Sequence, residues 1–269
     1  MRVTRWKIAA ATALLAGSLA ACGDAGSDNE GRQVDAKDDC ADKFDDGTRM
    51  KEISDAGKIN VGVKYDQPGL GFKGATEDVP AGFDIEIAKL LVADLCIDPA
   101  DTDAVNWTET VSDNREPFLE SGKVDIVLAS YSITDDRRKV VGQTGPYMIT
   151  GQQLLVKADS DVASIDDLKG EQVCSVTGST SIDRINEGGA KGVGFDSYSE
   201  CVQKVLDGTV SAMSTDGSIL AGFAAQNEGV ELDSLRLILC GGSAVPVSLQ
   251  KALQERHGLR IMQAWGMTE

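Results

Sequence analysis

Four apolar runs of the sequence are each followed at once by charged or hydroxyl-bearing residues, at positions 64–66, 130–137, 177–181 and 214–216. Side chains of these types bind small polar ligands through hydrogen bonds and charge. They do not form a hydrolytic site, because a serine nucleophile needs a neighbouring base and the only histidine, His257, lies close to the carboxyl end of the chain. The sequence therefore predicts a binding site without catalysis.

The segments that must position these groups alternate between short apolar runs and amphipathic stretches from Ile59 onwards, which predicts an α/β fold. Two such α/β units, joined near residues 148–152, indicate two lobes with a cleft between them. Ligands bind outside the carboxyl ends of the strands in sheets of this kind. Strands are predicted at 59–63, 105–107, 124–129, 153–156, 172–176, 193–195 and 210–213. Helices are predicted at 83–95 (with Phe83, Ile87, Leu90, Leu91 and Leu95 on one face), 115–120, 165–168, 179–186, 199–206 and 217–225.

The charge balance of the chain limits its partners. Its 269 residues include 26 Lys and Arg against 43 Asp and Glu, so the formal net charge is −17. This excess of negative charge argues against nucleic acid as a partner. It also repels an anionic ligand at long range, so a site for an anion requires a local cluster of cations.

The first residues are typical of an export signal. Basic residues at 2, 5 and 7 precede an apolar run at 8–19, which is too short to span a bilayer comfortably. The tetrapeptide Leu19-Ala20-Ala21-Cys22 resembles the lipobox of bacterial lipoproteins, in which the cysteine is acylated. We therefore predict a lipoprotein signal peptide at 1–22, a flexible tether at 23–39, and lipid anchoring through Cys22 at the extracytoplasmic face of the cell membrane. The alternative is an ordinary signal peptide with a fortuitous cysteine.

Export makes disulfide bonds possible for the other five cysteines. Cys174 and Cys201 would pair if their segments are neighbours, and Cys40 with Cys96 is a weaker second pairing. Cys240 is then left over. No cysteine or histidine spacing resembles a zinc site, so neither a metal nor another cofactor is predicted.

Several motifs occur in the order found in one known family. They include Val61-Gly62-Val63-Lys64-Tyr65-Asp66, Gly82-Phe83-Asp84-Ile85-Glu86, Ser130-Tyr131-Ser132-Ile133-Thr134 with Arg137, and Cys174-Ser175-Val176-Thr177-Gly178-Ser179-Thr180. Over about residues 40–230 the chain resembles the bacterial extracellular solute-binding proteins of family 3, and within them the glutamate-binding members. The resemblance implies a two-lobed, periplasmic-binding-protein-like fold of type II. Lobe one would span 40–148 and lobe two 149–231.

The resemblance also implies roles for residues that lie in these motifs. Arg137 would hold the α-carboxylate of an amino acid, because its guanidinium forms two parallel hydrogen bonds. Ser130 and Ser132 would bind the ammonium or the carboxylate. Thr180 opens a predicted helix, where free backbone N–H groups favour an anion. Asp216 would pair with the α-ammonium.

Two further cations predict the class of ligand. Lys64 lies where relatives that bind basic amino acids carry an acid, and Arg115 follows Asn114 as in the aspartate and glutamate binders. Together they favour an acidic amino acid over glutamine or another ligand. Tyr198 would close the pocket from lobe two. The alternatives are ordinary: Lys64 and Arg115 as solvated surface charges, and Ser130 and Ser132 as helix caps.

The resemblance to this family stops near Gly229. Residues 232–269, which contain Gly241-Gly242 and end in Trp265-Gly266-Met267-Thr268-Glu269, resemble adenylate-forming acyl-CoA synthetases instead. The glycine-rich phosphate loop of those enzymes is absent, so this tail is predicted to be inactive. Its own pattern is that of a strand at 235–240, a helix at 248–254 and a strand at 259–262. We expect the return of the chain to lobe one to be missing or replaced, apolar surface on lobe one to stay exposed, and stability and closure to be reduced. A divergent family ending is the alternative.

The sequence thus predicts a lipid-anchored binding protein that captures glutamate or aspartate and delivers it to the permease subunits of an ABC importer. Two alternatives come from other classes. One is a non-functional hybrid that carries an acyl-CoA synthetase fragment. The other is a sensor ectodomain, which requires a membrane helix and an output domain that this sequence lacks.

Overall fold

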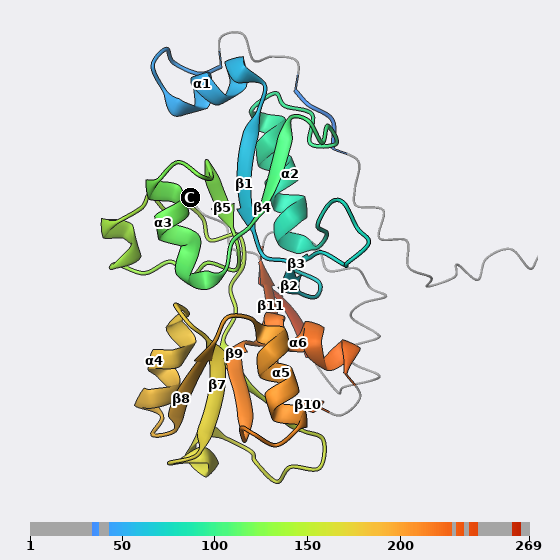
Figure 1. Ribbon diagram of the computed structural model, residues 1–269, viewed down its shortest axis with the longest axis vertical. Helices are drawn as coiled ribbons and strands as arrows, with labels where there is room; N and C mark the ends of the chain where they lie inside the picture. The colour runs from blue at the N-terminus through green and yellow to red at the C-terminus, as the bar shows by residue number, and fades with distance from the viewer. Residues whose placement is uncertain (1–33, 38–42, 228–229, 234–236, 242–259, 265–269) are drawn as a thin grey trace, which may run out of the picture. The chain divides into compact units, whose positions relative to one another are not determined.

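The computed structural model describes residues 34–37, 43–227, 230–233, 237–241 and 260–264 (Figure 1). Both main sheets belong to one compact unit that begins at Gly31. The predicted signal peptide with Cys22, most of the predicted tether, Cys40 and the predicted helix at 248–254 lie outside the described residues.

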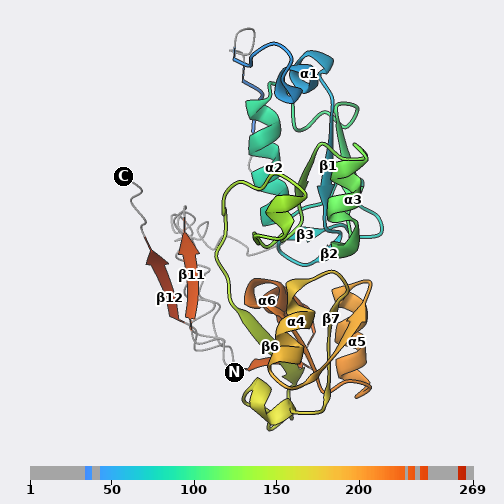
Figure 2. The ribbon, with the colours of Figure 1, turned by 90° about the vertical axis from the view of Figure 1, so that its left-hand side faces the viewer.

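The sheet of lobe one has three parallel strands in the order β4-β1-β5. β1 (Ile59–Val63) lies between β4 (Val105–Glu109) and β5 (Ile126–Leu128). Val61 and Val63 of the central strand are fully buried, as the continuous apolar pattern of a parallel strand requires. α2 (Phe83–Asp94) and α3 (Arg115–Glu120) lie on opposite sides of β1 (Figure 2).

Helix α2 faces the sheet with a different side from the one expected. Ile85, Ala88 and Val92 are buried against the core of lobe one. Phe83, Leu90 and Leu91 of the predicted apolar face are instead 38–46% exposed. The helix is apolar on nearly all sides, so its sequence pattern could not decide which side faces the sheet.

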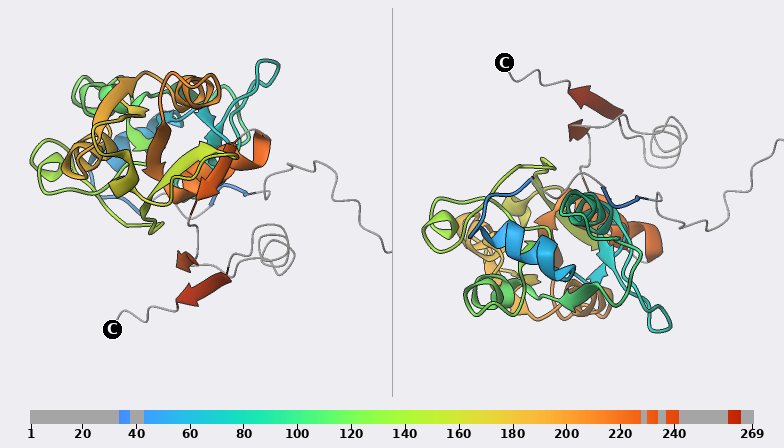
Figure 3. Two further views of the ribbon diagram at one scale, coloured as in Figure 1. Left: turned by 90° about the horizontal axis from the view of Figure 1, so that it is seen from below. Right: turned by 90° about the horizontal axis from the view of Figure 1, so that it is seen from above.

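Shorter elements complete lobe one. A β hairpin formed by β2 (Asp66–Gln67) and β3 (Gly71–Phe72) follows β1 directly and pairs in antiparallel fashion. The loop between β3 and α2 projects from the lobe in both views of Figure 3. The remaining elements are α1 (Arg49–Ala56) and the 3₁₀ turns η1 (Ser112–Asn114) and η2 (Arg137–Lys139).

The sheet of lobe two has five strands in the order β10-β6-β9-β7-β8. β7 pairs in parallel with β8 and β9, whereas β6 runs antiparallel to both β9 and β10. The mixed sheet agrees with the predicted two-lobed α/β architecture. The strands are β6 (Gln152–Lys157), β7 (Gln172–Val176), β8 (Lys191–Phe195), β9 (Ala212–Asp216) and β10 (Val230–Asp233).

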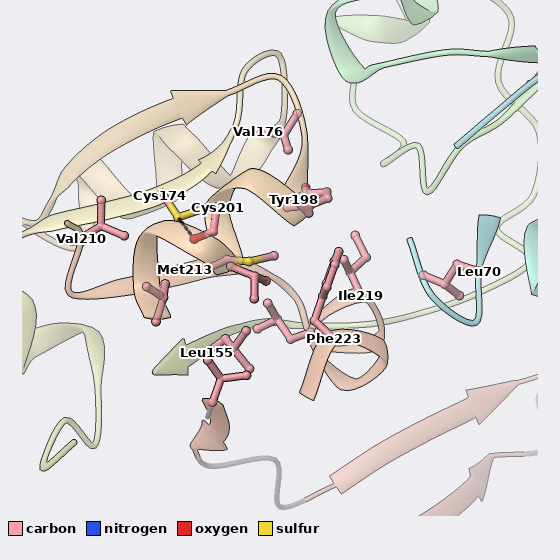
Figure 4. Packing of buried hydrophobic residues seen from close by; sticks show 14 residues of the cluster. Leu70, Leu155, Cys174, Val176, Tyr198, Cys201, Val210, Met213, Ile219 and Phe223 are labelled. Atoms are coloured by element: carbon pink, nitrogen blue, oxygen red, sulfur yellow. Dashed lines mark hydrogen bonds between the residues drawn. A yellow bond between two sulfur atoms is a disulfide. The ribbon is translucent and has the colours of Figure 1, made fainter. Parts of the chain in front are cut away.

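Both faces of this sheet are covered. α5 (Tyr198–Leu206) and α6 (Gly217–Gln226) pack on one face, where Leu155 and Met213 are fully buried. α4 (Thr180–Glu187) and the 3₁₀ turn η3 (Ile165–Leu168) pack on the other. Figure 4 shows the first of these two cores, which contains the disulfide between Cys174 and Cys201. Their Cα atoms are 5.9 Å apart, so the predicted pairing of these two cysteines is confirmed.

The last three described strands follow Gly229, near which the resemblance to the family was predicted to stop. In β10, Asp233 lies opposite Leu154, so the chain runs back towards the end of β6 that adjoins lobe one. β11 (Leu237–Gly241) and β12 (Arg260–Ala264) form a separate pair of parallel strands. Two parallel strands agree with the β-strands of the βαβ-like pattern expected for the tail.

Candidate functional site

A pocket between the two lobes gathers polar side chains from loops and element ends that are far apart in the sequence. The space between these side chains is about 250 Å³, part of it open to solvent. Lobe one contributes Gln67, Ser112, Arg115, Ser130, Ser132 and Arg137, and lobe two contributes Ser179, Thr180, Ser181, Tyr198, Thr215 and Asp216.

Seven of the eight predicted ligand-binding residues line this pocket; Lys64 does not. The structure adds residues that the sequence analysis did not select. Ser179, Ser181 and Thr215 lie within the strand-end segments 177–181 and 214–216, although they were not among the eight predicted ligand-binding residues. Gln67 and Ser112 carry no such signal, because their place depends on how the β2–β3 hairpin and η1 pack.

Lys64 lies behind the pocket wall rather than in it. Its side chain is buried, and its ammonium donates a hydrogen bond of 3.0 Å to the Ser112 hydroxyl, which itself lines the pocket. Burial, reinforced by the nearby charge of Arg115, lowers the pKa of Lys64 from 10.5 to about 8. Lys64 therefore contributes charge from behind Ser112. The sequence predicted a direct contact between Lys64 and the ligand instead.

Arg115 at the start of α3 is buried, and all three guanidinium nitrogens donate to backbone carbonyls. Nε donates to Ser112 O at 3.0 Å and Nη1 to Ala129 O at 3.3 Å, both within lobe one. Nη2 donates to Gly178 O in lobe two at 3.1 Å. Burial and the nearby Arg137 charge lower the pKa of Arg115 to about 10, which leaves it charged at neutral pH.

Arg137 meets the same carbonyl of lobe two. Its Nη2 donates to Gly178 O at 3.0 Å, and its Nη1 donates to Ser132 O at the same distance. Glu116 lies 3.5 Å from Nε and also accepts a hydrogen bond from the hydroxyl of Tyr131. The guanidinium carbons of Arg115 and Arg137 lie 4.4 Å and 4.5 Å from the centre of the Tyr131 ring. Tyr131 and Glu116 thus fix two like charges beside each other.

The shared acceptor, Gly178, needs to be a glycine. Its φ is +75°, and a Cβ atom there would lie 2.1 Å from Asp113 Oδ1 of lobe one. The loop between β7 and α4 can therefore approach lobe one closely only without a side chain at this position.

Ser130 is held in a conformation that is uncommon for a residue with a side chain, with φ at +45°. The buried carboxylate of Asp84 accepts hydrogen bonds from its backbone N–H at 2.9 Å and its hydroxyl at 3.2 Å. The hydroxyl of Tyr147 donates to the other carboxylate oxygen at 3.0 Å. Desolvation raises the pKa of Asp84, whereas these hydrogen bonds oppose the rise. Asp84 stabilises the pocket loop without lining the pocket itself.

Lobe two presents a carboxylate and hydroxyl groups to the pocket. Asp216 ends β9, which extends three residues beyond its predicted end. Within the described part of the chain, no hydrogen bond or ion pair engages the Asp216 carboxylate, and burial raises its pKa. Thr180 begins α4, where backbone N–H groups are free to donate to an anion.

Tyr198 holds the lobe-two wall in place. Its side chain is buried, and its hydroxyl lies 2.7 Å from Thr215 Oγ1. Ser181 donates to the same Thr215 oxygen at 3.3 Å. These hydroxyl groups satisfy one another's hydrogen-bonding capacity in the wall of the pocket.

The arrangement suits a small zwitterion. Two guanidinium groups on lobe one face an unpaired carboxylate on lobe two, so a ligand with a carboxylate and an ammonium can contact both lobes at once. Such a ligand binds the closed conformation better than the open one, because only the closed form brings both sets of groups together.

Comparison with known proteins identifies the family of the chain. The family model of the bacterial extracellular solute-binding proteins, family 3, matches residues 59–230. The glutamate-binding protein GluB of Corynebacterium efficiens is 37% identical over 232 residues, which cover 84% of this chain and 72% of the relative. The glutamine-binding protein GlnH of an ABC transporter of Bacillus subtilis is 36% identical over 80% of this chain and 75% of its own.

Solved structures agree with the fold. The structure of an ancestral arginine-binding protein bound to glutamine has a TM-score of 0.60 and 34% sequence identity, and it covers 66% of this chain and 78% of that one. The family and the curated relatives that match the chain are solute-binding proteins. More than half of the chain matches the family model, and we conclude that the chain belongs to the bacterial extracellular solute-binding proteins of family 3.

Proposed function

We propose that this protein binds an acidic amino acid, glutamate or aspartate, in the interlobe pocket and delivers it to the permease of an ABC importer. The observation that carries the proposal is the pairing of cationic Arg115 and Arg137 with the unpartnered carboxylate of Asp216 in one small pocket. An amino acid supplies the opposite charge to each of these groups.

The proposed contacts follow from the positions of the side chains. Arg137 donates to the ligand α-carboxylate. Its Nη2 gives up the hydrogen bond to Gly178 O and donates to the ligand instead. Asp216 accepts from the α-ammonium. Ser130, Ser132 and the N-terminus of α4 at Thr180 supply further donors, and Tyr198 closes the lobe-two wall.

The acidic side chain of the ligand is the less direct part of the proposal. Lys64 adds positive charge behind Ser112 and Arg115 adds it in the pocket lining, which favours a carboxylate over a cationic side chain. A second candidate is glutamine, because the donors of Arg115 are already used by backbone carbonyls and two relatives of similar identity are named for glutamine. An amide needs no compensating cation.

The site of action is also part of the proposal. The family is extracellular, and we propose a lipid anchor at Cys22 that holds the protein beside the permease. In the described part of the chain, no helix is both long enough and apolar enough to span a bilayer.

Calorimetric titration of the full chain with L-glutamate, L-aspartate, L-glutamine and L-arginine tests the proposal. We expect glutamate or aspartate to bind near micromolar Kd, about −8 kcal/mol, and arginine to give no heat. An Asp216→Asn variant is the matched control, since it removes the ammonium partner and conserves shape.

Each other outcome has a clear meaning. Tighter binding of glutamine would exclude the acidic ligand and keep an amino-acid-binding protein. Tight binding of arginine would contradict the cationic pocket. Silence with all four ligands in a sample that circular dichroism shows to be folded would favour the non-functional hybrid, in which the tail at 232–269 has abolished binding.

A further inference from the structure

The β2–β3 hairpin of lobe one (residues 66–72) contacts lobe two at points that lie outside the pocket. Leu70, at its turn, is only 6% exposed and belongs to the hydrophobic core of lobe two rather than that of lobe one. Figure 4 shows Leu70 on the turn of the hairpin, whereas the other labelled residues of this core lie on lobe two. The hairpin therefore places an apolar side chain from one lobe into the core of the other.

Helix α6 has a glycine where the hairpin approaches it. A Cβ atom at Gly222 would lie 2.1 Å from Pro68 O and 3.0 Å from Pro68 C, which is far closer than two atoms can pack. The three nearest atoms to that position all belong to Pro68. A glycine inside a helix destabilises that helix relative to alanine. Because this glycine has no side chain, the hairpin can approach α6 closely.

A third contact joins the hairpin to α5. The Asp66 carboxylate accepts a hydrogen bond of 2.8 Å from the backbone N–H of Tyr198, the first residue of that helix. A negative charge at a helix N-terminus is favourable, because the free N–H groups carry partial positive charge there. Tyr198 also lines the pocket, so this hydrogen bond ties the hairpin to the pocket wall.

We infer that the β2–β3 hairpin is a closure latch, whose contacts at Leu70, Gly222 and Asp66 set how tightly the ligand is held. The inference rests on the proposed function only in that the ligand binds between the lobes. Pro68, Leu70 and Gly222 do not line the pocket. They act on affinity solely by stabilising the closed conformation, because apparent Kd rises as the fraction of closed protein falls.

Gly222→Ala in the full chain is the decisive variant, because a latch and an ordinary structural residue predict opposite results. The methyl group blocks the hairpin and favours the helix. We expect the Kd for L-glutamate to rise roughly tenfold, while the thermal unfolding midpoint without ligand stays equal or rises. Gly142→Ala is the matched control, since nothing lies within 4 Å of its Cβ position, and it should bind like the wild type.

Two more variants test the same contact from the hairpin. Leu70→Ala should also weaken binding roughly tenfold, and combining it with Gly222→Ala should add little, because both remove one contact. Asp66→Asn keeps an oxygen that can accept from Tyr198 and should bind more tightly than Asp66→Ala. Wild-type affinity in Gly222→Ala, or full additivity of the two losses, would overturn the latch.

Small-angle scattering separates a failed latch from a failed ligand assignment. Without ligand, Gly222→Ala should have a larger radius of gyration than the wild type, whether or not glutamate binds. If none of the four amino acids binds and the variant is still more open, the ligand proposal fails and the latch stands. If the two proteins scatter identically without ligand and bind with equal Kd, the latch is wrong.

Discussion

The two faces of the pocket differ in how far their charges are satisfied before a ligand arrives. On lobe one, Arg115 and Arg137 donate to backbone carbonyls and flank Tyr131. On lobe two, the Asp216 carboxylate has no hydrogen-bonding partner among the described residues. The two arginines are therefore positioned before the ligand binds, whereas the Asp216 carboxylate has no hydrogen-bonding partner among the described residues until a ligand ammonium binds.

This difference indicates where the free energy for closure arises. Preordered arginines lose little side-chain freedom when a carboxylate arrives. A desolvated and unpaired carboxylate destabilises the closed form until the ligand ammonium meets it. The ligand ammonium therefore supplies a hydrogen-bonding partner that the Asp216 carboxylate lacks, whereas Arg137 exchanges an acceptor that it already has.

The largest expected effect comes from the preordered face. Arg137→Lys removes the planar pair of donors and retains the charge. We expect glutamate binding to weaken by about 3 kcal/mol, roughly 150-fold in Kd, as measured by calorimetry. The thermal midpoint should fall less than in Arg115→Met, which leaves carbonyls at Ser112 and Ala129 without a donor. A loss below about threefold would mean that Arg137 does not hold the carboxylate.

Asp216→Asn tests the unsatisfied face. Loss of a charged hydrogen bond should weaken binding by about 1.5–3 kcal/mol, roughly 10- to 150-fold. Burial holds the pKa of free Asp216 above 3.8, and the ligand ammonium lowers it in the complex, so binding releases a proton. Affinity should therefore fall as the pH decreases through the range between the pKa of Asp216 in the free protein and its pKa in the complex. The Kd of the Asp216→Asn variant should depend less on pH.

The raised pKa of Asp216 makes folding stability depend on pH in the opposite direction to ligand affinity. Because the carboxyl of Asp216 binds its proton more tightly in the folded chain, its contribution to stability is greatest at low pH and declines as the pH rises past 3.8. Thermal unfolding without ligand should show the Asp216→Asn variant to be as stable as the wild type or more so near neutral pH. A clear loss of stability would mean that Asp216 has a partner in the free protein.

Lys64 allows a smaller test of its indirect role. Its pKa of about 8 lies below 10.5, so it loses its charge as the pH rises through 8. If the ligand carboxylate raises this pKa by about one unit, the Kd should increase roughly fivefold between about pH 7 and 9. Glutamine should change less over the same range, and Lys64→Met should remove the difference between the two ligands. Equal pH profiles for glutamate and glutamine in the wild type would contradict a role for Lys64 in choosing the ligand.

The strand-end pattern predicted most of the pocket, because parallel strands bring their carboxyl ends to one edge whatever the surrounding packing. Arg137 and Asp216 lie in these strand-end segments, and the family resemblance supplied their expected roles. The environment of Arg115 could not be predicted, because its acceptors come from positions as distant as Ser112 and Gly178. The burial of Lys64 and the role of Gly222 likewise depend on contacts between segments that no local pattern encodes.

The smallest expected effect concerns Asp84, which supports the lobe-one face from behind. Asp84→Asn keeps one oxygen for Ser130, so we expect glutamate affinity to fall only about two- to fivefold. Glycine adopts a positive φ without strain, so the same change in a Ser130→Gly background should cost less affinity if Asp84 acts by holding Ser130 at φ +45°. Tyr147→Phe removes only the hydrogen bond to Oδ1 and should lower the thermal midpoint without changing Kd. Equal losses of affinity from Asp84→Asn in both backgrounds would show that Asp84 acts on the lobe as a whole and not through Ser130.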